Sequence, residues 1–216
     1  MRYPLRHLQN LMPSKEINRG ANGQMSTTND LEFTIRRKVF QLFGASFHIY
    51  KADGSLLGFS KQKAFKLKED IRIFTDESAT VEKLRITARA IIDFSAAYDV
   101  VESSNNAKLG ALQRKGWTSL VRDTWQVLDA NDREVGQVLE DSSFLSILRR
   151  FVDWASWIPQ TFHLYDANKK ELARFKTHFN PFVHRMTVTV MPDCPLHPLM
   201  VLASGVLLMA IEGRQT

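Results

Sequence analysis

The sequence predicts a mainly β (α+β) fold, in which a closed antiparallel barrel surrounds a buried C-terminal helix. Proline is absent from residues 14–158, and apolar and polar residues alternate there in many short runs. Such alternation is typical of strands that bury one face. In addition, one motif recurs four times, and an uncharged apolar run, residues 199–211, lies close to the end of the chain.

The recurring motif predicts four β-hairpins. Each copy opens with an aromatic residue, passes through apolar residues into a polar turn, and resumes with an apolar residue before a small one. The turns carry Asp53-Gly54, Asn105-Asn106, Asn131-Asp132 and Asn168-Lys169, and residues of these types tolerate a positive φ. The copies start at uneven separations, which argues against a propeller of equal blades and favours a closed sheet with paired edges. They read FHIYKADGSLLG from Phe47, YDVVESSNNAKLG from Tyr98, WQVLDANDREVG from Trp125 and FHLYDANKKELA from Phe162.

The apolar run from Leu199 to Ile211 predicts a helix enclosed by protein. It has 13 uncharged residues, whereas a helix that spans a bilayer needs roughly 20. Pro198 precedes the run, where proline suits a helix start, and Gly213 follows it. Because the run is apolar on every side, no face of it favours water. The small residues 203–205 would let a barrel wall approach the helix closely.

A second, amphipathic helix is expected at Ser142–Val152. Ser142 is a good N-cap, and Phe144, Ile147 and Phe151 share one helical face.

Composition favours a single soluble domain. The chain has 216 residues, of which 44% are hydrophobic and 24% charged, so neither disorder nor an integral membrane class is well supported. We expect residues 31–216 to form the domain and residues 1–30 to be a flexible basic tail, which lacks the apolar core of a secretory signal. The single cysteine, Cys194, excludes an intrachain disulfide and fits a cytoplasmic location.

Five separated strings of the sequence are informative together: KQKAFKLKEDIRIFTDES from Lys61, IIDFSAAYDV from Ile91, LGALQRKGWTSLVRDTWQVLDANDREVGQVLEDS from Leu109, FNPF from Phe179 and LLMAIEGRQ from Leu207. These strings resemble the tubby C-terminal-like superfamily, and specifically its LURP-one-related and scramblase-like branch. The resemblance covers roughly residues 31–216 and implies a barrel of about twelve antiparallel strands around a central C-terminal helix. Members are associated with phosphoinositide binding at membranes, with phospholipid scrambling, or with no assigned role.

The sequence offers no convincing catalytic or metal site. It contains neither G-x-S-x-G nor H-E-x-x-H, and its ten glycines are scattered over turns instead of forming a phosphate loop. Cys194 and His197 lie three residues apart without further clustered ligands, which favours a structural loop. His48 and His163 occupy the same position in two motif copies, which indicates a repeated strand position. We therefore expect no enzymatic activity, no cofactor and no metal.

Residues 129–140, DANDREVGQVLE, superficially resemble a calcium-binding loop. Asp129 stands at the first position, but Arg133 and Glu134 occupy the fifth and sixth, where such a loop needs an oxygen ligand and a glycine. A hairpin turn explains these residues better.

The basic residues carry the functional expectation. The net charge of +6 favours anionic partners such as phospholipid headgroups or nucleic acid. We expect a non-catalytic module that recognises anionic phospholipid or phosphoinositide headgroups. Such a module would contact the membrane peripherally, at its inner face. Scramblase-like lipid translocation, and nucleic-acid or protein binding, are the alternatives. The candidate headgroup-binding residues are Arg36, Arg37, Lys38, Lys61, Lys63, Lys66 and Lys68.

Overall fold

The structure is a computed structural model that describes residues 31–38, 45–62, 70–89, 97–114, 124–141, 159–178, 180 and 183–211. These residues form twelve strands and one helix, α2 (Pro198–Ile211). The strands are β1 (Leu31–Lys38), β2 (Ala45–Lys51), β3 (Leu56–Gln62), β4 (Asp70–Phe74), β5 (Glu82–Ala88), β6 (Ala97–Glu102), β7 (Ala107–Arg114), β8 (Thr124–Leu128), β9 (Glu134–Glu140), β10 (Thr161–Tyr165), β11 (Glu171–His178) and β12 (Val183–Val190).

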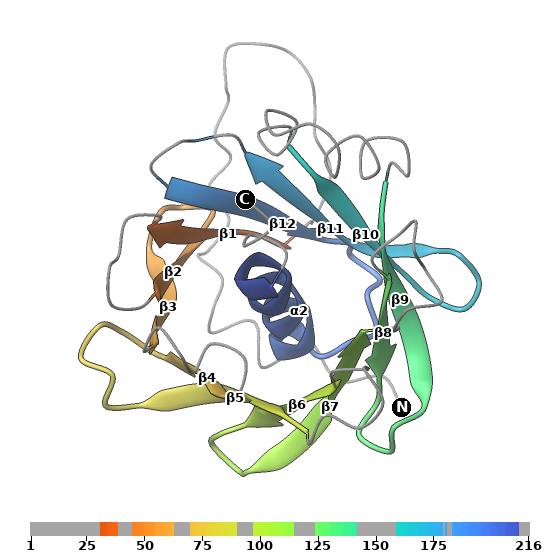
Figure 1. The fold of residues 1–216 in the computed structure, drawn as a ribbon, viewed down its shortest axis with the longest axis horizontal. Helices are drawn as coiled ribbons and strands as arrows, with labels where there is room; N and C mark the ends of the chain where they lie inside the picture. Colours follow the sequence, from red (N-terminus) through yellow and green to blue (C-terminus); the bar gives the residue numbers. More distant parts are fainter. Residues whose placement is uncertain are drawn as a thin grey trace.

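The strands form one closed barrel. Each strand pairs antiparallel with the next along the chain, and β1 closes the sheet by pairing with β12. Figure 1 looks into the barrel and shows α2 enclosed by the ring of strands. The predicted closed antiparallel barrel around a C-terminal helix is therefore confirmed. In the described ranges every strand thus has a paired neighbour on both sides, although β3 and β4 share only the pair Phe59 and Phe74.

The four motif copies form the hairpins β2–β3, β6–β7, β8–β9 and β10–β11, as the sequence predicts. In each turn the second residue of the predicted pair has a positive φ. These angles are 83° at Gly54, 54° at Asn106, 62° at Asp132 and 62° at Lys169. Short polar side chains, or glycine, make this left-handed conformation less costly, although Lys169 adopts it as well.

The register of each hairpin also explains the end of the motif. A one-residue shift follows every turn, so the apolar residue before the small one lies in a β-bulge. A Cβ atom on Gly136 would lie 2.6 Å from the carbonyl oxygen of Tyr165 on the neighbouring strand. The small residue therefore permits close approach of the next hairpin.

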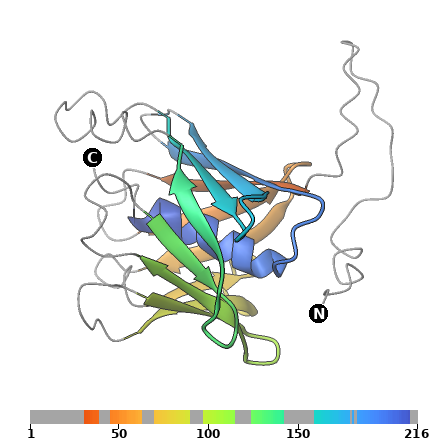
Figure 2. The same cartoon turned by 90° about the vertical axis from the view of Figure 1, so that its right-hand side faces the viewer.

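Helix α2 forms the centre of the core, and Figure 2 shows it running along the inside of the barrel. All residues from Met200 to Ala210 are buried. A Cβ on Gly205 would lie 2.8 Å from Cδ1 of Ile35 and 3.2 Å from Cγ2 of Val188, so the wall of β1 and β12 does approach the helix at its small residues. The hydroxyl of Ser204 donates to the carbonyl of Met200 at 2.9 Å and is thereby satisfied. Within the described ranges, no helix combines the length and apolarity needed to cross a membrane.

The expected helix at Ser142–Val152 and the expected basic tail, residues 1–30, lie outside the described residues.

Candidate functional site

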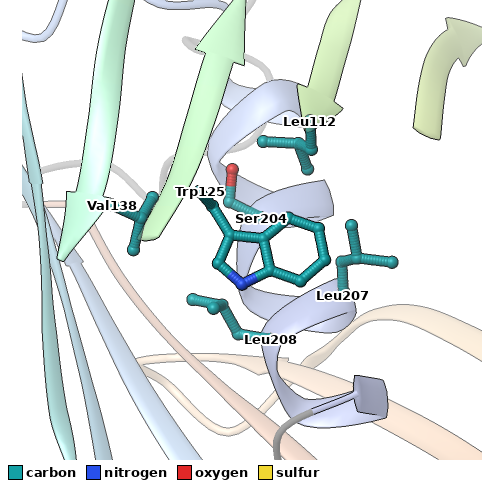
Figure 3. Close-up of a pocket in the computed structure, with 6 residues that line it drawn as sticks. All are labelled: Leu112, Trp125, Val138, Ser204, Leu207 and Leu208. Carbon is teal, nitrogen blue, oxygen red and sulfur yellow. The ribbon is translucent and has the colours of Figure 1, made fainter. Parts of the chain in front are cut away.

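A crevice inside the described part of the barrel is too small for a ligand. It lies between α2 and strands β7, β8 and β9, and it has no room for a water molecule. In Figure 3 the indole of Trp125 lies beside α2, close to Leu207 and Leu208. Ligand pockets are far larger than such a crevice. This crevice is therefore no candidate site, and the charged side chains of the outer surface offer the alternative. The crevice is lined by Leu112, Trp125, Val138, Ser204, Leu207 and Leu208.

Strand register aligns four basic side chains across the outer wall formed by β2, β1, β12 and β11. Arg36 faces His48 on one side and Arg185 on the other, and Arg185 in turn faces His178. Since Ile35 is buried, strand alternation directs Arg36 outward, where it is exposed. We call His48, Arg36, Arg185 and His178 the basic row.

A further cation extends the basic row on β11. Lys176 lies two residues before His178 and is exposed on the same outer face, opposite Thr187. Within the described part of the chain, Arg36, Arg185 and Lys176 have no carboxylate oxygen within ion-pair distance. This wall therefore carries uncompensated positive charge.

Aromatic contacts support one end of the basic row. The guanidinium carbon of Arg36 lies 4.7 Å from the ring centroid of Tyr50. The ring of His48 stacks on Tyr50, with 6.2 Å between centroids, and its Nε2 lies 3.0 Å from Oε1 of Glu77. The cation–π contact stabilises Arg36 without neutralising its charge.

His178, at the opposite end of the basic row, lies near two positive charges. Nε2 of His178 lies 2.8 Å from Oγ1 of Thr187. Burial lowers the pKa of His178, the charges of Lys176 and Arg185 lower it further, and the charge of Glu32 acts in the opposite direction. The surroundings of His178 therefore favour the neutral imidazole.

A second wall, formed by β4 and β5, contains an arginine that has carboxylate partners. Arg72 donates to Asp70 at 2.9 Å and to Glu82 at 3.3 Å, and it faces Arg85 across β4 and β5. Arg85 donates to Oδ1 of Asn106 at 2.7 Å.

A larger ion-pair network lies next to this pair. Arg89 binds Asp99 with two hydrogen bonds of 3.0 and 2.6 Å, and Lys108 lies 2.8 Å from Asp132. The hydrogen bond from Arg89 is the main cause of the lowered pKa of Asp99. Positive charge is thus balanced on this side of the barrel.

Comparison with known proteins identifies the family. The family model described as LURP-one-related matches residues 57–208. The chain belongs to the LURP-one-related family. This family is part of the tubby-like superfamily, so the resemblance inferred from the sequence is confirmed. A search of the curated proteins gave no match.

The LURP-one-related barrel separates the basic residues that the sequence groups together. Arg36 and Lys61 are exposed on the outer wall. Arg37 has the opposite parity in β1, and its Nη1 donates to the carbonyl of Met209 at 3.5 Å. The side chain of Lys38 lies outside the described residues, as do Lys63, Lys66 and Lys68.

Arg37 has a structural role at the end of the buried helix. Its guanidinium lies 5.9 Å from the centroid of the Phe47 ring, inside the barrel wall. A cation near the last carbonyls of a helix interacts favourably with the helix dipole. Burial, and secondarily the charge of Arg37, lowers the pKa of the inward-facing, half-buried His184.

The weaker sequence patterns of the LURP-one-related domain have structural explanations. Oδ1 of Asp129 accepts hydrogen bonds from the backbone amides of Asn131 and Arg133, as a hairpin turn requires. Burial raises the pKa of the Cys194 thiol, which opposes reactivity. Among the described residues no three His, Cys, Asp or Glu side chains are grouped as metal ligands.

His48 and His163 do occupy equivalent positions. Each ring stacks on the tyrosine two residues later, with interplanar angles of 11° and 13°. Nδ1 of His163 lies 2.7 Å from Oε1 of Glu171, within its own hairpin. His163 thus has its acidic partner within its own hairpin. His48 has Glu77 as its acidic partner and also lies beside Arg36.

Sequence reasoning missed Arg185, Lys176 and His178. Each alternates with apolar or small residues in a strand, which predicts an outward direction. Their proximity to Arg36 depends on the pairing of β1 with β12, which no local pattern specifies.

Proposed function

We propose that this protein is a non-catalytic binding module whose outer wall of β1, β11 and β12 holds anionic phospholipid headgroups at a membrane surface. The observation that carries the proposal is the directly facing pair Arg36 and Arg185, which lacks carboxylate partners among the described residues. Two facing like charges destabilise a sheet. An anionic ligand would relieve their repulsion.

The shape of the site supports a surface as the partner. The charged residues lie along a barrel wall, and the crevice beside α2 has no room for a water molecule. A wall of this kind can contact several headgroups at once. The cytoplasmic leaflet carries anionic lipids, so the proposal includes a cytoplasmic protein that associates peripherally with the inner membrane face.

Lipid translocation is less compatible with this fold. Helix α2 has 14 residues and is buried along its length from Met200 to Ala210. Spanning a bilayer would require the helix to leave the core and to recruit flanking residues.

Vesicle co-sedimentation tests the proposal with a matched pair of variants. Arg36→Gln/Arg185→Gln and Arg72→Gln/Arg85→Gln each remove two facing arginines and the same net charge. Each basic residue near an anionic surface contributes about 1 kcal/mol, so the first variant should bind anionic vesicles about 30-fold more weakly. The second should bind nearly as the unchanged protein does.

Three results would contradict the proposal: equal binding to neutral and anionic vesicles, equal loss in both folded variants, or preference for DNA over anionic vesicles at the same salt concentration. Binding should also weaken as salt screens the surface charges.

A further inference from the structure

Four residues at the β11 end of the basic row form a compact polar square. His178 on β11 faces Arg185 on β12. Lys176, two residues earlier on β11, faces Thr187 on β12. Facing side chains on neighbouring strands start about 5 Å apart, and residues two apart on one strand start about 7 Å apart. The square therefore has the dimensions of a single phosphate group with its hydrogen-bond donors.

The donors of the square differ in chemistry and converge from two strands. Lys176 and Arg185 are exposed cations at opposite corners. Between them, the imidazole of His178 is hydrogen-bonded to the hydroxyl of Thr187 at 2.8 Å. Ammonium, guanidinium and imidazolium groups are the strongest protein donors to phosphate oxygens.

The charges around His178 disfavour its protonation while the square holds no anion. Burial lowers the pKa of His178, and the charges of Lys176 on the same strand and of Arg185 on β12 lower it further, while Glu32 from β1 raises it by a smaller amount. On the β10 side, the described neighbours Gln160 and Thr161 carry no charge. A bound dianion would reverse this balance, because it would lie beside both cations and the imidazole.

We infer that Lys176, Arg185, His178 and Thr187 form a binding site for a phosphomonoester group, whose binding places a proton on His178. A phosphomonoester carries a charge of about −1.5 to −2 at pH 7, whereas a phosphodiester carries one. Two fixed cations and an imidazolium match the more highly charged group. The inference rests on the proposed function and adds to it a headgroup class and a coupling to protons. Binding and protonation are linked: protonation of His178 raises the affinity for the ligand, and the ligand raises the affinity of His178 for protons by the same factor.

The test uses the full chain and vesicles of phosphatidylcholine that contain either phosphatidate, a monoester, or phosphatidylglycerol, a diester, at equal total charge. We expect the phosphatidate vesicles to bind about fivefold more tightly, as one additional charge contact near the surface implies. Calorimetry in two buffers of different ionisation enthalpy measures the protons taken up on binding.

His178→Gln and His48→Gln are matched variants from the two ends of the basic row. His178→Gln should reduce both proton uptake and the preference for the monoester. His48→Gln should change neither, because His48 lies next to Glu77 and away from Lys176. Protonation of the lipid itself is common to all three proteins and cancels in the comparison.

The outcomes separate the inference from the proposed function. If anionic vesicles bind but His178→Gln leaves proton uptake and monoester preference unchanged, the phosphate site is wrong and the proposed function stands. If no anionic vesicles bind, the proposed function is wrong. An NMR titration of His178 with soluble glycerol phosphate then decides the inference: a raised pKa supports a site for a soluble phosphomonoester, and an unmoved pKa overturns it.

Discussion

Two pairs of facing arginines occupy different walls of this barrel, and their surroundings differ. Arg72 and Arg85 face each other across β4 and β5, beside Asp70 and Glu82. Arg36 and Arg185 face each other across β1 and β12, where the described residues provide no carboxylate partner.

The difference shows which positive charges have carboxylate partners within the barrel and which remain available to a ligand. Carboxylates around Arg72 compensate the like-charge contact with Arg85 and so support the sheet. The Arg36–Arg185 contact keeps its repulsion and has only the ring of Tyr50 beneath Arg36. A protein near its stability threshold commonly keeps such a cost where function requires it.

The largest effect is expected from removing the support that both walls share. Truncation before Pro198 removes α2, whose residues Met200–Ala210 are all buried in the barrel. The barrel would then expose its apolar inner face, so we expect loss of cooperative folding. Circular dichroism and thermal melting check this expectation. A truncated protein that melts cooperatively would show that the walls do not depend on the helix.

Single substitutions should separate the two arginine pairs by the sign of their effect. Arg72→Gln removes two exposed ion pairs and should lower the free energy of unfolding by up to about 1 kcal/mol. Arg185→Gln relieves a like-charge contact and should raise it by roughly 0.2–1 kcal/mol at low salt. Denaturant titrations at low and high salt measure both. Equal destabilisation would mean that Arg185 has a stabilising partner.

Acidification should destabilise the basic-row side first. The folded state lowers the pKa of His178 and of His184, so it binds fewer protons there than the unfolded chain does. The free energy of unfolding should fall as pH drops through the ordinary histidine pKa near 6.5.

The compensated wall responds only at lower pH, because the lowered pKa of Asp99 and of Asp132 contributes stability that is lost below about pH 4. Denaturant titrations between pH 7.5 and 5, where the histidines titrate, should therefore show a free energy of unfolding that falls as the pH falls. The double variant His178→Gln/His184→Gln should reduce this pH dependence. An unchanged slope would assign the pH dependence to other groups.

The smallest effect concerns Glu32, the acid that shares the outer face of β1 with Arg36. Glu32→Gln removes a negative charge that opposes anion binding and should strengthen co-sedimentation with anionic vesicles by up to about fivefold. The pKa of His178 should fall slightly in the same variant, because Glu32 raises it. Weaker vesicle binding would contradict the assignment of this wall.

The hairpins and the central helix could be predicted because local chemistry specifies them. Turn residues such as Gly54 and Asn106 mark positions of positive φ, and the alternation around them gives the strands. The inward direction of Arg37 was also available from the sequence, since Phe33 and Ile35 alternate with Arg36. The candidate headgroup-binding residues include both Arg36 and Arg37, although a strand sends neighbouring side chains to opposite faces.

By itself, the sequence determined the fold class, the four hairpins and a helix too apolar to lie anywhere but in the core. Only the tertiary structure decided which charges meet. Closure of the ring pairs the first strand with the last, and that register places Arg36 beside Arg185, which in turn lies beside His178. Strand pairing between distant segments depends on the whole closed sheet, so the charge left uncompensated on its surface is a property of the assembled barrel.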